Sequence, residues 1–274
     1  MKVAFYGTRG SIPVAEPDYV RFGGNTSCIL ITFTNGRIGI LDAGTGMRKL
    51  GHDFAVRSIE QYDNVFIGLS HTHWDHIQGF PFFIPAYDRR RHFTISICEE
   101  GRNTNDLESI FATQMQHDYF PVSLDKMGAT LIFWQADVTD FTTPSGVNII
   151  ASKHNHPGNA YGYRITEGKT TLVYCTDVEH VGGIDPNVVA LARNADLLIH
   201  DAQYTPEELK DKKGWGHSSW EQAVEVALHA GVKKLALFHH DPEHNDAFLL
   251  NIEKECQRQF SEAFLAREGL EIEM

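Results

Sequence analysis

Three histidines and one aspartate lie within six positions of the sequence, in the stretch HTHWDH: His71, His73, Asp75 and His76. Imidazole and carboxylate groups are ligands of Zn²⁺ and of related divalent metals. In an extended backbone His71 and His73 point to the same side, because side chains alternate with period two. After a turn, Asp75 and His76 would reach a second position. The spacing therefore predicts a centre of two metal ions about 3.5–4 Å apart.

More ligands must come from elsewhere in the chain, and apolar runs typical of strands end in suitable residues. Functional groups in layered α/β folds collect on loops at one end of the strands, so we expect these residues to meet at a common rim. The residues that follow or end such runs are His71, His154 and His156, Asp177, His200 and Asp201, and His239 and His240.

We expect His156 to complete the first metal position, His239 the second, and Asp177 to bridge both. His154 and His240 stand beside these histidines in the sequence and are alternatives for the same roles. A set of imidazoles and carboxylates without thiolate predicts two divalent ions per chain, with Zn²⁺ expected and Mn²⁺ or Fe as alternatives. Asp42, in LDAGTG, is expected to hold the site together by hydrogen bonds.

Length and composition indicate an ordinary globular protein. The chain has 274 residues, with 42% hydrophobic and 22% charged residues, and we expect one domain over residues 1–274. No apolar run reaches the roughly 18 residues of a membrane helix, and the first residues do not resemble a signal peptide. The cysteines are scattered without a CxxC pair, which predicts buried, reduced thiols in a cytoplasmic protein: Cys28, Cys98, Cys175 and Cys256.

The formal net charge is −12, and the only dense basic run is the segment 88–92, DRRRH. Binding to a phosphate backbone needs clustered lysines and arginines. The charge therefore predicts that extended nucleic acid is not the partner of this chain.

Strand and helix patterns alternate along the whole length, which predicts a layered α/β sandwich (α+β in some schemes). Helical patterns cover residues 107–115, 186–193, 218–229 and 245–266. Ser218 and Glu221 form a predicted capping box, and Gly231 suits the end of that helix. The predicted strands lie in KVAFYG, SCILITF, RIGILDAG, NVFIGLSH, HFTISICE, ATLIFWQ, VNIIASKH, AYGYRIT, TTLVYCTD, DLLIHDA and KLALFHH.

The HTHWDH stretch resembles the H-x-H-x-D-H signature of the metallo-β-lactamase superfamily. Later family ligands match His156 in NHPGNAYGYRI, Asp177 in YCTD and His239 in LALFHH, and LDAGTG matches an early aspartate–glycine turn. The resemblance covers essentially the whole chain. It implies a four-layer αββα sandwich with mixed sheets and a dinuclear metal site at the sheet edge.

A second stretch is similar to the ribonuclease Z-like phosphodiesterase branch of this superfamily. Residues 200–203, HDAQ, stand where that branch has H-E-A-T, and residues 217–219, HSS, where it has H-S-T. The resemblance implies that His217 donates a proton and that Asp201 orients it. Aspartate is one methylene shorter than glutamate, so direct contact between Asp201 and His217 stays open.

Within this branch, the segments RGSIPVAEPDYVRFGGNTSC and THWDHIQGFPFFIPAY look like those of small cyclic-phosphate phosphodiesterases. We therefore predict a homodimeric hydrolase of a small cyclic phosphodiester, either a cyclic nucleotide or a ribose cyclic phosphate. A metal-bridging hydroxide would attack phosphorus, with Asp75 or Asp177 accepting its proton. Asn25, Tyr163 and residues 80–87 are candidates to shape the pocket, but residues 80–87 are expected to pack or to form a dimer contact rather than to stack on a base. The alternatives are a ribonuclease Z-like nuclease acting on RNA, a thioester or lactone hydrolase, and a non-catalytic sensor of cyclic nucleotides.

Overall fold

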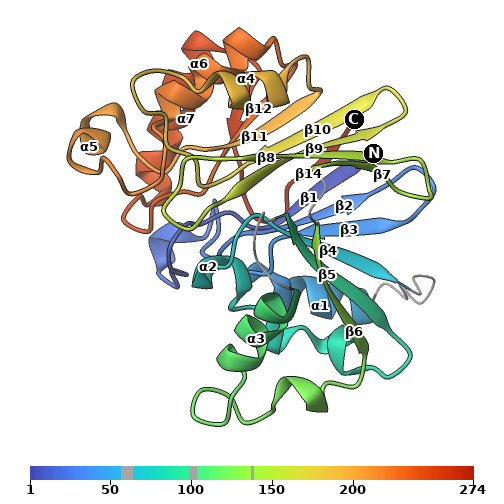
Figure 1. The fold of residues 1–274 in the computed structure, drawn as a ribbon. Helices are drawn as coiled ribbons and strands as arrows, with labels where there is room; N and C mark the ends of the chain where they lie inside the picture. Colours follow the sequence, from blue (N-terminus) through green and yellow to red (C-terminus); the bar gives the residue numbers. More distant parts are fainter. Residues whose placement is uncertain (57–63, 99–103, 137–138) are drawn as a thin grey trace.

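The computed structural model describes residues 1–56, 64–98, 104–136 and 139–274. Its strands form two sheets (Figure 1). The first sheet contains β1 (Lys2–Gly7), β2 (Cys28–Thr32), β3 (Ile38–Leu41), β4 (Val65–Leu69), β5 (His92–Cys98), β6 (Thr130–Ala136) and β14 (Glu271–Glu273). The second contains β7 (Asp140–Thr142), β8 (Asn148–Lys153), β9 (Tyr161–Glu167), β10 (Thr170–Cys175), β11 (Leu197–Asp201), β12 (Leu235–Phe238) and β13 (Ala263–Leu265).

The helices cover the outer faces of the two sheets, so the molecule has four layers (Figure 1). Helices α1 (Gly46–Val56) and α3 (Thr104–Gln114) pack on the first sheet. Helices α4 (Pro186–Ala192), α6 (Trp220–Ala230) and α7 (Asp246–Gln259) pack on the second. The short helices are α2 (Trp74–Ile77), α5 (Pro206–Asp211), and the 3-10 turns η1 (Pro17–Tyr19), η2 (Phe80–Phe82), η3 (Ile84–Tyr87) and η4 (Leu124–Lys126).

A third apolar cluster fills the space between the sheets. Phe5 and Leu41 from the first sheet meet Tyr174, Ile199 and Phe238 from the second, and all five side chains are buried. Burial of such side chains contributes about 1.5–3 kcal/mol each. The αββα sandwich implied by the sequence is therefore confirmed.

Strand direction explains why the candidate residues meet. The first sheet runs in the order β14-β1-β2-β3-β4-β5-β6 and the second in the order β13-β12-β11-β10-β9-β8-β7. Strands β10 to β13 are parallel to one another, whereas β9 is antiparallel to both β8 and β10. Consequently β8, β10, β11 and β12 all end at the same edge of the sheet. Strand β11 ends in His200 and Asp201, and each of the other three strands is followed within two residues by a histidine or an aspartate.

Every predicted strand is present, but the helix ends differ from the prediction. Helix α6 is capped by Ser219 with Gln222, not by Ser218 with Glu221, because the buried Ser218 hydroxyl donates to the carbonyl of Val178. Gly231 ends that helix in the left-handed conformation, as predicted. The helix predicted over 245–266 ends at Gln259, since the following apolar residues form β13 beside β12.

The other two predicted helices, 107–115 and 186–193, are present as α3 and α4 with slightly shifted ends. All four cysteines are buried free thiols, as expected from the sequence. Among the residues that the structure describes, no helix has the length and apolar character to cross a membrane.

Candidate metal centre

Left-handed backbone conformations turn several site residues inward at the strand ends. Asp42 follows β3, Asp177 follows β10 and His239 follows β12, with φ angles of 58°, 54° and 63°. Non-glycine residues adopt this region rarely, and outliers of this kind cluster at functional sites. The three strand ends therefore carry local strain that the surrounding fold must hold in place.

His71, His73 and His156 form the first group of candidate ligands, because one nitrogen of each lies near those of the other two. Nε2 of His156 is 3.2 Å from Nδ1 of His73. Nε2 of His71 is buried and has no hydrogen-bond partner among the residues that the structure describes. A buried nitrogen without a partner is costly, unless a ligand such as a cation occupies the space that it faces.

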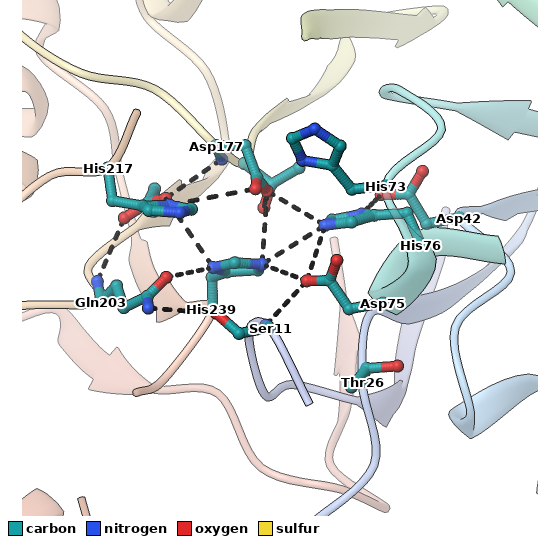
Figure 2. A network of polar contacts seen from close by, with 12 residues as sticks. Ser11, Thr26, Asp42, His73, Asp75, His76, Asp177, Gln203, His217 and His239 are labelled. Carbon is teal, nitrogen blue, oxygen red and sulfur yellow. Dashed lines mark hydrogen bonds and ion pairs between the residues drawn. The ribbon is translucent and has the colours of Figure 1, made fainter. Parts of the chain in front are cut away.

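Asp75, His76, Asp177 and His239 form the second group. Nε2 of His239 lies 3.3 Å from Nε2 of His76 and 3.1 Å from Oδ2 of Asp75. All four side chains are buried. Their ring nitrogens and carboxylate oxygens converge on one point (Figure 2).

Asp177 connects the two groups through its two carboxylate oxygens. Oδ1 faces the first group, at 3.7 Å from Nε2 of His71 and 4.0 Å from Nε2 of His156. Oδ2 faces the second, at 3.2 Å from Nε2 of His76 and 3.4 Å from Nε2 of His239. This is the arrangement that a carboxylate bridging two ions requires.

The outer nitrogen of most of these imidazoles is held by a fixed partner. When Nδ1–H donates, Nε2 keeps a free lone pair directed at the group, which is the usual arrangement around a bound metal. Nδ1 lies 3.1 Å from Ser70 Oγ in His71, 2.8 Å from Asp42 Oδ2 in His76, 2.9 Å from the Gly216 carbonyl in His156, and 3.0 Å from Gln203 Oε1 in His239. The proposed ligand atoms are thus oriented before any ion binds.

The charges of the cluster also fit divalent cations. Asp75 and Asp177 are buried, and in the described part of the chain their ion pairs are all with imidazoles. Burial raises the pKa of Asp177, but His239, His76 and His71 outweigh it and hold that pKa well below its usual value. Burial lowers the pKa of His76, but Asp75, Asp177 and Asp42 raise it well above its usual value. The carboxylates therefore favour positive charge in this space, which metal ions supply.

His217 lies beside this cluster and contacts Asp201 directly. Its Nδ1 atom is 2.7 Å from Oδ2 of Asp201, so the shorter aspartate reaches the histidine. The His217 ring stacks on that of His239, with ring centres 5.0 Å apart. Burial lowers the pKa of His217, but Asp201 and Asp177 raise it further, to about 9.

The two alternative histidines lie outside both groups. Nδ1 of His154 contacts the Thr176 carbonyl at 3.3 Å, and its Nε2 faces the backbone of Gly162. Nε2 of His240 donates to the Ala266 carbonyl at 2.7 Å. Both rings are buried but have no place among the converging ligand atoms.

A pocket of about 430 Å³ opens over the cluster, and its lining corrects part of the sequence interpretation. Asn25, Tyr163 and residues 80–87 do not line it, because Asn25 is bonded to Glu268 and the buried Tyr163 hydroxyl donates to the Leu69 carbonyl. The lining residues are Ser11, Thr72, His73, Trp74, Asp75, Asp177, His217 and His239.

Ser11 and Gln203 belong to the site although the sequence interpretation assigned them no role. The Ser11 backbone N–H donates to Oδ2 of Asp75 at 2.8 Å, and the Gln203 side chain joins His239 to the Ser11 hydroxyl (Figure 2). The sequence interpretation did place Gln203 just after a strand, because it is the last residue of the HDAQ segment. No spacing rule, however, connects residue 11 with residues 75 and 203.

Comparison with known proteins gives relatives that extend along the whole chain. Ribonuclease Z of Picrophilus torridus is 26% identical and is aligned over 98% of this chain and 94% of its own length. Ribonuclease Z of Archaeoglobus fulgidus is also 26% identical, over 100% and 97%. The metallo-beta-lactamase fold protein YhfI from Bacillus subtilis has a TM-score of 0.73 at 25% identity, covering 100% of this chain and 98% of that one. Human tRNase Z, short form, shares the fold at 20% identity, with a TM-score of 0.67 over 100% and 99%.

These relatives overturn the predicted partner. The sequence interpretation favoured a small cyclic phosphodiester and disfavoured extended nucleic acid, yet the full-length relatives are named for ribonuclease activity. The likeness of two segments to small cyclic-phosphate phosphodiesterases and the net charge of −12 led to this error. A charge summed over the whole chain says nothing about the potential at one site.

The cluster, the fold and the relatives agree with a match to a family model. The model described as Beta-lactamase superfamily domain matches residues 39–240, which contain most of β3, all of β4 to β12 and every candidate ligand named above. Divalent-metal binding and hydrolysis follow from this membership together with the His/Asp cluster. The chain belongs to the β-lactamase superfamily, in its ribonuclease Z-like branch, and is a metal-dependent hydrolase.

Proposed function

We propose that this protein is a ribonuclease Z-like phosphodiesterase that cleaves RNA. The observation that carries the proposal is the buried His217–Asp201 pair at the edge of a pocket lined by the candidate metal ligands. The full-length relatives named Ribonuclease Z support the same substrate class. A thioester or lactone hydrolase, the alternative, would account for the metal ligands. Its substrates contain no phosphate, however, so this alternative leaves the position of His217 unexplained.

We further propose that His71, His73 and His156 hold one ion and that Asp75, His76 and His239 hold a second, with Asp177 between them. Imidazole and carboxylate donors without a thiolate suit Zn²⁺. When bound, divalent ions would supply Lewis acidity and positive charge for the phosphoryl oxygens in the transition state. The residues around them fix the orientation of these ligands.

His217 would act as the general acid. Its Nδ1–H donates to Asp201, which directs the opposite nitrogen, Nε2, away from the carboxylate. The Asp201 carboxylate stabilises the protonated ring, so that Nε2–H can donate to the leaving oxygen of the scissile phosphodiester. Asp201 is thus a positioning residue, whereas His217 touches the reacting atoms. His217 would thus protonate the leaving group, and Asp201 would hold its ring in position and stabilise its charge.

The test compares three substrates with the Zn²⁺-loaded protein: a precursor tRNA with a 3′ extension, an unstructured oligoribonucleotide and an acyl thioester. The proposal expects cleavage of RNA at a phosphodiester bond, with no turnover of the thioester. Turnover of the thioester alone would instead place the protein among acyl hydrolases. A homodimer and a single domain over residues 1–274 stay predictions, which light scattering and limited proteolysis would check.

A further inference from the structure

Two tryptophans near the pocket are strongly exposed, although tryptophan usually buries most of its surface. Trp74 is 77% exposed and Trp215 is 57% exposed. By contrast, Trp220 in α6 is 7% exposed. Exposed aromatic rings at the edge of a pocket have a cost in water and indicate a binding surface.

Trp74 belongs to the metal-ligand segment itself. It is the first residue of α2, stands between His73 and Asp75, and lines the pocket. The α2 turn fixes its backbone, because the Gln78 N–H donates to the Trp74 carbonyl at 2.8 Å. The indole is therefore presented to solvent from a backbone that the candidate ligands on both sides hold in place.

Trp215 stands two residues before His217, on a loop that Glu179 holds. Oε1 of Glu179 accepts the Gly214 N–H at 2.7 Å, and Oε2 accepts the Gly216 N–H at 2.9 Å. Glu179 is itself buried, and both glycines have left-handed backbones, with φ angles of 83° and 89°. The exposed indole thus lies between two glycines whose backbones are hydrogen-bonded to Glu179. This restraint limits the conformational entropy that the loop loses when a ligand stacks on the indole.

The loop also carries positive charge. Nζ of Lys212 lies 4.1 Å from the centre of the Trp215 ring, and Lys213 is exposed next to it. The charges of the preceding helix α5 are mixed, since Lys210 pairs with Glu207 at 3.9 Å. A lysine beside an exposed aromatic ring combines backbone attraction with base stacking, as in proteins that bind single-stranded nucleic acid.

Each of the two tryptophans is close in sequence to a residue that lines the pocket. Figure 2 shows His217 and Asp75 on opposite sides of His239, and Trp215 and Trp74 are their close neighbours in the sequence. A strand of RNA whose scissile phosphate lies between His217 and Asp75 would place its flanking nucleotides near the segments that carry these two tryptophans.

We propose that Trp74 and Trp215 form a stacking subsite for unpaired nucleotides next to the scissile phosphate, with Lys212 contacting the RNA backbone. This inference rests on the proposed ribonuclease function and names the part of the substrate that the site recognises. Stacking on an aromatic side chain tolerates any base, so the subsite would select unpaired RNA rather than a sequence.

The first experiment measures binding of a short phosphorothioate oligoribonucleotide to the Zn²⁺-loaded protein, by fluorescence anisotropy and by quenching of tryptophan emission. Trp74→Ala and Trp215→Ala should each weaken binding by about 5- to 150-fold, the usual range for loss of one stacked base. Trp74→Phe and Trp215→Phe keep a ring and should restore most of the affinity. Trp134→Phe, in β6 and outside the lining of this pocket, should leave the affinity for RNA unchanged.

The second experiment keeps the wild-type protein and removes the bases. An oligoribonucleotide with abasic positions beside the cleavage site should have a KM raised by a similar factor, and Trp215→Ala should add little to that loss. Equal KM values for intact and abasic RNA, together with unchanged binding by both alanine variants, would overturn the stacking subsite while leaving the ribonuclease function standing. Failure of the wild-type protein to bind or cleave any RNA would overturn both proposals.

Discussion

The Nδ1 atom of His217 lies 2.7 Å from Oδ2 of Asp201, and this contact is part of a larger network. The same buried carboxylate accepts the backbone N–H groups of Asp177, Gln203 and Ser218, at 3.0–3.1 Å. One side chain at the end of β11 therefore orients the proposed acid and also joins the segments that follow β10 and β11 to the segment before α6. Catalytic and structural effects at this position should be separable by choice of substitution.

Replacing His217 by alanine should lower turnover of RNA by about 10²- to 10⁴-fold, the range for loss of a general acid. Metal content should stay at the wild-type value, because His217 is not among the proposed ligands. Steady-state kinetics and elemental analysis measure the two quantities. His229→Ala, an exposed histidine in α6, is the control and should behave as wild type. Unchanged turnover in His217→Ala would remove the residue from the mechanism.

Replacing Asp201 by alanine should reduce the free energy of unfolding much more than His217→Ala does. The substitution leaves three buried backbone N–H groups without an acceptor, at about 1–3 kcal/mol for each group. His217→Ala removes only one of the four donors and leaves the backbone contacts in place. Urea unfolding of both variants measures the difference. Equal midpoints and slopes would show that the carboxylate has no structural role.

The metal cluster could be predicted from the sequence because its information is local. His71, His73, Asp75 and His76 lie within one turn of chain, and each later residue follows an apolar strand that can be recognised by itself. Strand direction then brings these residues together, since parallel strands end at the same edge of a sheet. The choice of His156 over His154 followed from the resemblance and stays a prediction. In the structure Nδ1 of His154 contacts the Thr176 carbonyl, and the ring lies outside both groups of candidate ligands.

Other parts of the site depend on contacts between distant segments, which no local pattern contains. Ser11 reaches Asp75 because the segments after β1 and β4 leave the first sheet at the same edge. Glu179 reaches Gly214 and Gly216 only because the fold brings the segment after β10 beside the loop before α6. The cap of α6 shifted by one residue for a similar reason, since both Ser218 and Ser219 suit the local rule. Only the buried contact of Ser218 with Val178 decides between them.

Metal content should separate the proposed ligands from their neighbours. His156→Ala and His239→Ala should each lose metal, whereas His154→Ala and His240→Ala should keep the wild-type content. Asp177→Ala should lose metal at the second position, because the bridging oxygen is gone. Elemental analysis of dialysed protein gives the stoichiometry. A full complement of ions in Asp177→Ala would contradict its bridging role.

Removing metal with a chelator should lower the thermal stability of the wild-type protein. Without ions, the facing nitrogens of His76 and His239 and the carboxylates of Asp75 and Asp177 stay buried together. A ligand at 1,000 times its Kd stabilises the folded state by about 4.1 kcal/mol, so Zn²⁺ should raise the melting temperature by several degrees. Differential scanning calorimetry with and without Zn²⁺ measures this shift. An unchanged melting temperature would argue against binding at the cluster.

Gly214 and Gly216 offer a matched pair of substitutions on the loop that carries Trp215. Both have positive φ angles, so alanine costs about 1 kcal/mol or more of backbone strain at either position. A Cβ atom on Gly214 would meet nothing within 4 Å, whereas one on Gly216 would lie 2.1 Å from Nδ1 of His156.

Gly216→Ala should therefore displace His156 and lose both metal and RNA cleavage, whereas Gly214→Ala should lower stability slightly and keep both. Elemental analysis, kinetics and thermal unfolding of the two variants test this difference. The same contact explains why residue 216 must be glycine. The Gly216 carbonyl accepts a hydrogen bond from the His156 ring, and a methyl group at this position would collide with that ring. Normal metal content in Gly216→Ala would argue against His156 as a ligand at the proposed first position.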